Sequence, residues 1–243
     1  MTEQEVSYWK RVSEAEFITE DGCYKKCGSF CCRWDSADMP FRIIPKGGTL
    51  FYMPKEYEYL KVYGSVPSAA PYNMSICFNK DKPPVKVYYR HCSDDNGCNI
   101  LFSRSLFCKL YPFLPVFDID GEITDVKYIS VYDITAELIG YETPCFVKGM
   151  KNKYKTLWSL GGGNADLLRE PYVLFHLMAA SLLHDNYVRK LSSMNNLISL
   201  KAPDFWKKWE KEYLSGSLID RDMFSSSLNN LYDEFEKKYN GCL

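Results

Sequence analysis

The chain has 243 residues, of which 46% are hydrophobic and 25% are charged. This length supports one sizeable domain with a normal hydrophobic core, and this composition excludes a largely disordered chain. The formal net charge of -1 at pH 7 gives no electrostatic reason to expect nucleic acid or an anionic membrane as a partner.

The first residues are charged, and no stretch reaches the roughly 18 uninterrupted apolar residues that a membrane-spanning helix needs. We therefore expect a cytoplasmic protein with no membrane partner. Cysteines in that reducing compartment bind metal or serve catalysis more often than they form structural disulfides. The 10 cysteines are also too few for a disulfide scaffold, in which roughly 8 to 10% of residues are cysteine.

The N-terminal half of the chain predicts a mixture of helices and short strands. Apolar residues recur near a helical period over residues 3 to 17, so an amphipathic helix is expected there. Residues 54 to 64 predict a second helix, because proline stands in its first turn and glycine at its end. The expected strands are residues 41 to 53, as two short strands around a Lys-Gly-Gly turn, residues 85 to 90, and residues 113 to 131, as a hairpin around Asp120-Gly121.

The C-terminal part of the chain, from about residue 150, has few strand signals. Helical patterns cover residues 165 to 198, 203 to 215 and 217 to 238. We predict a cysteine-cluster metal-binding domain over residues 1 to 150 and a helical subdomain over residues 151 to 243. The expected fold class is therefore α+β, with a small cysteine-rich metal-binding core of short strands and a β-hairpin, followed by a helical part.

Eight of the cysteines fall into two separated groups. The first group lies in DGCYKKCGSFCCRW, residues 21 to 34, and the second begins in HCSDDNGCNILFSRSLFCKLYPF. Eight thiolates are the number that two four-thiolate centres need, whether zinc sites or iron-sulfur clusters, and one centre with spare thiols is the other arrangement. The predicted metal ligands are Cys23, Cys27, Cys31, Cys32, Cys92, Cys98, Cys108 and Cys145.

Local geometry favours more than one centre. Adjacent side chains of an extended segment point to opposite faces, so Cys31 and Cys32 are expected to serve different metals. Cys77 stands among apolar residues and is interpreted as a small buried hydrophobe. Cys242 is interpreted as a thiol outside the centre.

These motifs resemble a known family. The array C-x3-C-G-x2-CCR, then C-x5-C-x9-C-K-L-Y-P-F, then P-C-x3-G is similar to the YkgJ-type cysteine-cluster family of bacterial and archaeal proteins, described as zinc- or iron-chelating. The resemblance covers residues 23 to 149. It extends distantly to the cysteine region of the flagellin lysine methylases, and this implies an iron-sulfur cluster and methyl transfer from S-adenosylmethionine as an expectation.

The function expected from the sequence is metal binding by a multi-cysteine iron-sulfur or zinc centre with a structural or redox role. The alternative is a cluster-dependent enzyme that methylates a protein substrate, so the sequence leaves open whether the chain is an enzyme. Radical chemistry fits less well, because its C-x3-C-x2-C motif would need cysteine where Phe30 stands. The expected partners are metal ions and, under the alternative, a protein substrate, with no nucleic acid.

Iron is preferred over zinc from the cysteine spacing. Zinc sites favour gaps of about two to four residues, and the second group has gaps of five and nine. A separate glycine-rich stretch, SLGGGNADLL, has two readings: a loop that binds a nucleotide-like ligand at Gly161 to Gly163 with Asn164 capping a helix, or a plain connection. The plain connection is the preferred interpretation.

Overall fold

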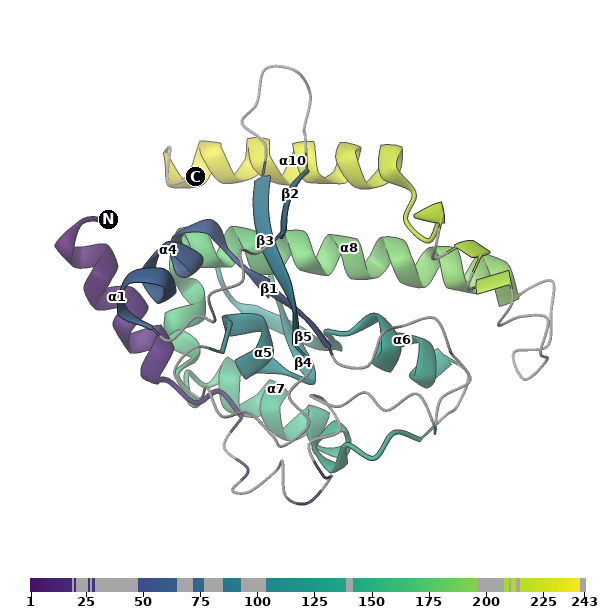
Figure 1. Cartoon of the computed structure of the whole chain (residues 1–243), viewed down its shortest axis with the longest axis horizontal. Coiled ribbons are helices and arrows are strands. Elements are labelled where there is room, and N and C mark those ends of the chain that lie inside the picture. Colours follow the sequence, from purple (N-terminus) through teal and green to yellow (C-terminus); the bar gives the residue numbers. More distant parts are fainter. Residues whose placement is uncertain are drawn as a thin grey trace.

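The computed structural model has a mixed α+β fold with two small antiparallel sheets (Figure 1). The statements below concern the residues that it describes. These are residues 1–18, 20, 26, 28, 48–64, 72–76, 85–92, 104–138, 142–195, 208, 209, 211, 212 and 215–240.

The first helix, α1 (Glu3–Glu14), confirms the amphipathic helix predicted near the N-terminus. Thr2 and Glu5 form a capping box, in which each side chain accepts the backbone N–H of the other residue. Trp9 and Val12 are each 2% exposed and form the buried face of the helix. This face packs on α4 (Pro54–Tyr63), the second predicted helix, which begins with proline and ends at Gly64 as expected.

The larger sheet has three strands in the order β1 (Gly48–Tyr52), β3 (Val85–Cys92) and β2 (Tyr72–Ile76). Strand β3 confirms the strand expected at residues 85 to 90. Strand β1 pairs with β3 in an antiparallel register, so its partner lies far along the chain. The rest of the predicted strand pair at residues 41 to 53 lies outside the described residues.

The predicted hairpin is confirmed as β4 (Phe113–Phe117) and β5 (Ile123–Tyr128). Its turn is organised by the Asp118 carboxylate, which accepts the backbone N–H groups of Asp120 and Glu122, both at 2.9 Å. Gly121 has a φ of 83°, a conformation that glycine adopts without steric cost.

The remaining elements are helical. Two long helices, α8 (Pro171–Asn195) and α10 (Arg221–Tyr239), lie side by side in Figure 1. Phe175 of α8 packs edge-on against Phe235 of α10, with 5.4 Å between the ring centroids. Helix α8 also packs on β4, and α7 packs on β5. The shorter helical elements are α5 (Leu106–Leu110), α6 (Val131–Leu138), η3 (Phe146–Met150), α7 (Lys151–Ser159) and η4 (Ala165–Arg169).

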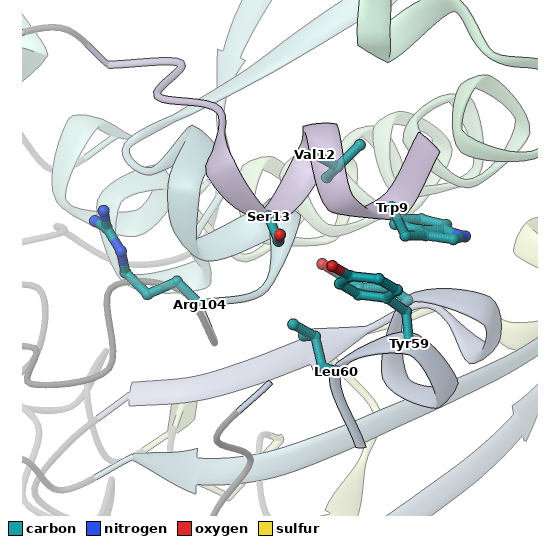
Figure 2. A pocket seen from close by; sticks show the side chains of 7 residues that line it. Trp9, Val12, Ser13, Tyr59, Leu60 and Arg104 are labelled. Carbon is teal, nitrogen blue, oxygen red and sulfur yellow. The ribbon is translucent and has the colours of Figure 1, made fainter. Parts of the chain in front are cut away.

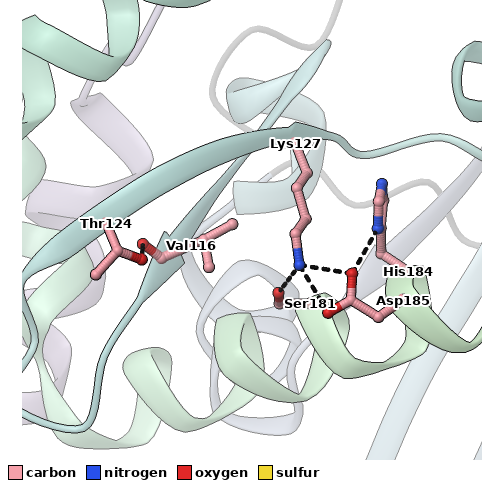
Figure 3. A network of polar contacts seen from close by, with 6 residues as sticks. All are labelled: Val116, Thr124, Lys127, Ser181, His184 and Asp185. Carbon is pink, nitrogen blue, oxygen red and sulfur yellow. Dashed lines mark hydrogen bonds and ion pairs between the residues drawn. The ribbon is translucent and has the colours of Figure 1, made fainter. Parts of the chain in front are cut away.

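A polar cluster joins the hairpin to α8 (Figure 3). The Lys127 ammonium donates to the Ser181 hydroxyl at 2.9 Å and to the two Asp185 carboxylate oxygens at 2.6 and 2.8 Å. His184 contacts the same carboxylate at 3.2 Å. The three N–H donors of the ammonium therefore have three acceptors, and the cluster holds strand β5 on the helix.

The glycine-rich stretch ends a helix. The N–H of Gly161 donates to the carbonyl of Trp158, and the N–H of Gly162 donates to the carbonyl of Leu157, so the loop closes the C-terminus of α7. The nucleotide-loop interpretation would have Asn164 cap a helix, but its side chain makes no cap and instead donates to the carbonyl of Glu16 at 2.9 Å. The described geometry therefore supports the plain connection.

Alanine substitutions at three glycines separate backbone strain from crowding. Gly161 has a φ of 79° and open space around it, whereas Gly163 has a φ of 60° and a Cβ there would lie 3.2 Å from the Trp158 Nε1. Gly161→Ala should lower the free energy of unfolding by about 1 kcal/mol, and Gly163→Ala by about 2 kcal/mol or more. Gly149→Ala is the control, because nothing lies within 4 Å. Equal urea midpoints for Gly163→Ala and Gly149→Ala would contradict this account.

Candidate metal centre

Three of the eight predicted ligands lie among the described residues. Cys108 lies in α5, Cys145 directly precedes η3, and Cys92 ends β3, where its backbone alone is described. The ligand set therefore stays a prediction. The other five predicted ligands lie outside the described residues, as do the two cysteines excluded from the centre: Cys23, Cys27, Cys31, Cys32, Cys98, Cys77 and Cys242.

Cys108 lies on a short helix whose start is fixed by side chains. The Ser105 hydroxyl accepts the N–H of Cys108 at 3.3 Å, which caps the helix. The Glu56 carboxylate, from α4, accepts the N–H of Leu106 at 2.5 Å and the N–H of Met53 at 3.1 Å. One buried carboxyl group therefore accepts backbone N–H groups at the beginnings of two helices, α4 and α5.

Lys109, the neighbour of Cys108, is buried with 4% exposure. Its ammonium donates to the carbonyls of Ser13 at 2.6 Å and Ala15 at 3.0 Å, at the end of α1 where helix carbonyls lack internal partners. Burial is the main cause that lowers the pKa of Lys109, and the nearby Arg104 lowers it further. The Lys109 contact therefore joins α5, the helix of Cys108, to the end of α1. The chain continues from there toward the first cysteine group.

Cys145 is 9% exposed and stands at the start of a 3-10 turn. The N–H of Lys148 donates to the Cys145 carbonyl at 3.2 Å and closes that turn. The next residue, Phe146, carries the ammonium of Lys26 over its ring, with 4.7 Å between Nζ and the ring centroid. Because Lys26 belongs to the first cysteine group, this contact brings the group to the residue beside Cys145.

Glu20 adds a second contact on the same side of the molecule. Its carboxylate pairs with Lys153 of α7, and the Tyr154 hydroxyl donates to it at 3.2 Å. The hydrogen bond from Lys153 is the main cause that lowers the pKa of Glu20. Glu20, three residues before Cys23, therefore contacts α7, which directly follows η3 and Cys145.

The strand register fixes the position of the Cys92 backbone. Gly48, the first residue of β1, is the cross-strand partner of Cys92, the last residue of β3. Cys92 therefore lies at one end of the larger sheet.

Two hollows among the described residues have no cysteine in their lining. Figure 2 shows the first, between α1 and α4, which has a volume of about 10 Å³ and suits a single water molecule. Burial raises the pKa of Glu56, which lines it, to about 8. The second is an open hollow of about 280 Å³ between Met1, Val6, Glu58, Val62 and Tyr63. The full lining of the first is Trp9, Val12, Ser13, Glu56, Tyr59, Leu60 and Arg104.

Of the three described histidines, His91 lies in β3, where its backbone alone is described, and the other two have structural contacts. His176 is buried in α8, where its Nδ1 donates to the carbonyl of Tyr172 at 2.7 Å and its ring packs on that tyrosine at 4.4 Å. Burial lowers the pKa of His176 to about 4. His184 contacts Asp185 in the cluster of Figure 3.

Sequence reasoning missed three buried charged groups around the predicted ligands: Glu56, Lys109 and Asp133. Lys109 stands in the apolar run LFCKLYPF, which is the one signal that could have indicated burial. Each of the three side chains has a partner in another element, namely Leu106, the end of α1 or Lys148, and spacing alone did not reveal these contacts.

Comparison with protein-family models, curated proteins and solved structures finds no match for this chain. Within the described residues, no group of three or more histidine, cysteine, aspartate or glutamate side chains is arranged to hold a metal ion. No described helix combines the length and the apolarity that crossing a bilayer requires.

The Lys109 contact can be tested by removing its charge. Lys109→Met keeps the aliphatic stem but leaves the carbonyls of Ser13 and Ala15 without their buried donor, so we expect a loss of about 2 to 3 kcal/mol in the free energy of unfolding. Lys10→Met is the control, since its ion pair with Glu14 is exposed and should contribute less than about 0.5 kcal/mol. Similar urea midpoints for the two variants would show that the buried contact does not stabilise the fold.

Proposed function

We propose that this protein binds metal through cysteine thiolates drawn from both cysteine groups, with an iron-sulfur cluster as the first choice and zinc as the alternative. The observation that carries the proposal is the contact between Lys26, a residue inside the first cysteine group, and the ring of Phe146, the neighbour of Cys145. Ligands that are distant in sequence can share a metal only if the fold brings their stretches together in this way.

Two further contacts support the same proposal. Lys109 holds the helix of Cys108 at the end of α1, from which the chain continues toward the first cysteine group. Glu20, three residues before Cys23, pairs with Lys153 of α7, the helix that follows Cys145 and η3.

The charges around the described ligands suit thiolates. Lys109 follows Cys108 directly, and Lys26 and Lys148 lie near Cys145 in space or in sequence. Positive charge close to a thiol favours its ionised form, which is the form that binds metal.

A buried hydroxyl beside Cys145 also fits a bound thiolate centre. Thr143, two residues earlier, has its Oγ1 buried, and no hydrogen-bond partner for it exists among the described residues. Buried polar groups nearly always have a partner, and hydrogen bonds to the sulfurs are a usual way in which proteins tune a metal-thiolate centre. The Thr143 hydroxyl is therefore available as a donor to such a centre.

Iron is proposed ahead of zinc because of the spacing of the second group, whose gaps of five and nine residues exceed those of short zinc-binding motifs. A structural or an electron-carrying role is compatible with this centre. Methyl transfer to a protein stays a prediction from the sequence alone. We propose no nucleotide site for it, because the glycine-rich loop closes α7.

The test is metal and sulfide analysis of protein purified without oxygen. We expect a brown protein that absorbs near 400 nm and contains iron and acid-labile sulfide, since these are the signatures of an iron-sulfur cluster. Cys108→Ser and Cys145→Ser should each lose at least half of the bound metal. Cys77→Ser is the matched control and should keep all of it.

Two results would change the proposal. Colourless protein with stoichiometric zinc and no sulfide would replace iron by zinc and leave the ligands as proposed. Protein without metal, or with the eight cysteines joined as disulfides, would contradict the proposal as a whole.

A further inference from the structure

Lys148 connects Cys145 to a buried carboxylate. Its backbone N–H donates to the Cys145 carbonyl at 3.2 Å, and its ammonium lies 3.2 Å from the Asp133 Oδ1. The Asp133 side chain is fully buried, and the Lys148 side chain is 13% exposed. The ion pair is therefore largely shielded from water. Two opposite charges attract each other more strongly at such a shielded site than at an exposed one.

Asp133 is itself held in place by α6. The Ser130 hydroxyl donates to the Asp133 Oδ2 at 2.5 Å, and the backbone N–H of Asp133 donates back to the Ser130 hydroxyl at 3.0 Å. These two bonds fix the carboxylate at the start of the helix and leave its Oδ1 directed at Lys148.

The Lys148 ammonium has a second partner in β5. It lies over the Tyr128 ring, 4.5 Å from the ring centroid. Two rigid elements, α6 and the hairpin, thus hold one side chain of η3. The turn that begins at Cys145 cannot rotate without breaking a buried ion pair.

We propose that Lys148 is a positioning residue for Cys145: its ion pair with Asp133 fixes the 3-10 turn and orients the cysteine sulfur toward the metal. This inference rests on the proposed function, because it takes Cys145 as a ligand. A buried charge that loses its partner is strongly unfavourable, so the pair holds one arrangement of the turn rather than several.

Lys151 provides a matched comparison for Lys148. Its ammonium lies over the same Tyr128 ring, at 5.3 Å. Among the described residues, however, Asp133 pairs with Lys148 and not with Lys151. Replacing either lysine by methionine takes one cation away from the Tyr128 ring. Only the replacement of Lys148 also breaks the buried ion pair with Asp133.

The experiment compares four variants of the anaerobically purified protein: Lys148→Met, Lys148→Arg, Asp133→Asn and Lys151→Met. The readouts are the visible spectrum of the bound metal, the rate at which a chromophoric chelator removes it, and the rate at which iodoacetamide alkylates Cys145. Lys148→Met should release metal at least tenfold faster, shift the spectrum and raise the alkylation rate. Lys148→Arg should restore all three readouts, and Lys151→Met should match the parent protein.

Asp133→Asn serves as a second test if Lys148→Met does not fold. This substitution retains the shape of the Asp133 side chain and removes its charge. It should change the three readouts in the same direction as Lys148→Met. If Lys148→Met or Asp133→Asn behaves like Lys151→Met while Cys145→Ser loses metal, the positioning role is wrong and the proposed function stands. If Cys145→Ser keeps full metal, Cys145 is not a ligand, and both the inference and that part of the proposed function are wrong.

Discussion

The buried ammonium of Lys109 is the contact on which the arrangement of the candidate centre most depends. It replaces water at two carbonyls that end α1, and in doing so it holds α5 and Cys108 where the chain turns toward the first cysteine group. Lys26, inside that group, contacts Phe146, the neighbour of Cys145. These two contacts join the segments of Cys108 and Cys145 to residues that precede or belong to the first cysteine group.

Ionisable side chains anchor the segments that carry two of the described cysteines, Cys108 and Cys145. Glu56 of α4 bonds to the start of α5, and Lys109 of α5 bonds to the end of α1. Lys148 of η3 pairs with the buried Asp133 of α6, so Cys108 and Cys145 each lie on or directly before a short helical segment that ionisable groups anchor to other elements. Buried ionisable groups are costly unless they are paired or hydrogen-bonded, and all four are. Short segments of this kind have little stability of their own, because helix formation is unfavourable over so few residues. Their anchors therefore decide where the cysteines lie.

Local patterns in the sequence predicted the elements with strong local signals. The capping residues of α1, the proline and glycine that bound α4, and the turn residues of the β4–β5 hairpin are all visible in the sequence. Helices α5, α6 and α7 and strand β2 were missed, because five to nine residues carry too little periodicity to distinguish a helix or a strand. A cap by Asn164 belonged to the less favoured nucleotide-loop interpretation, and the actual partner of its side chain, Glu16, is distant in sequence. The spacing of the cysteines indicated the candidate centre, but the contacts that organise it could not be predicted from spacing.

The central claim is that cysteines from both groups share a thiolate metal centre. X-ray absorption at the edge of the bound metal tests it most directly, because the first shell reports the type and distance of the ligand atoms. The account predicts a first shell of sulfur alone, at about 2.3 Å as in known metal-thiolate sites, and a loss of sulfur scattering in Cys108→Ser and Cys145→Ser. A first shell of nitrogen and oxygen, or one that neither substitution changes, would contradict it.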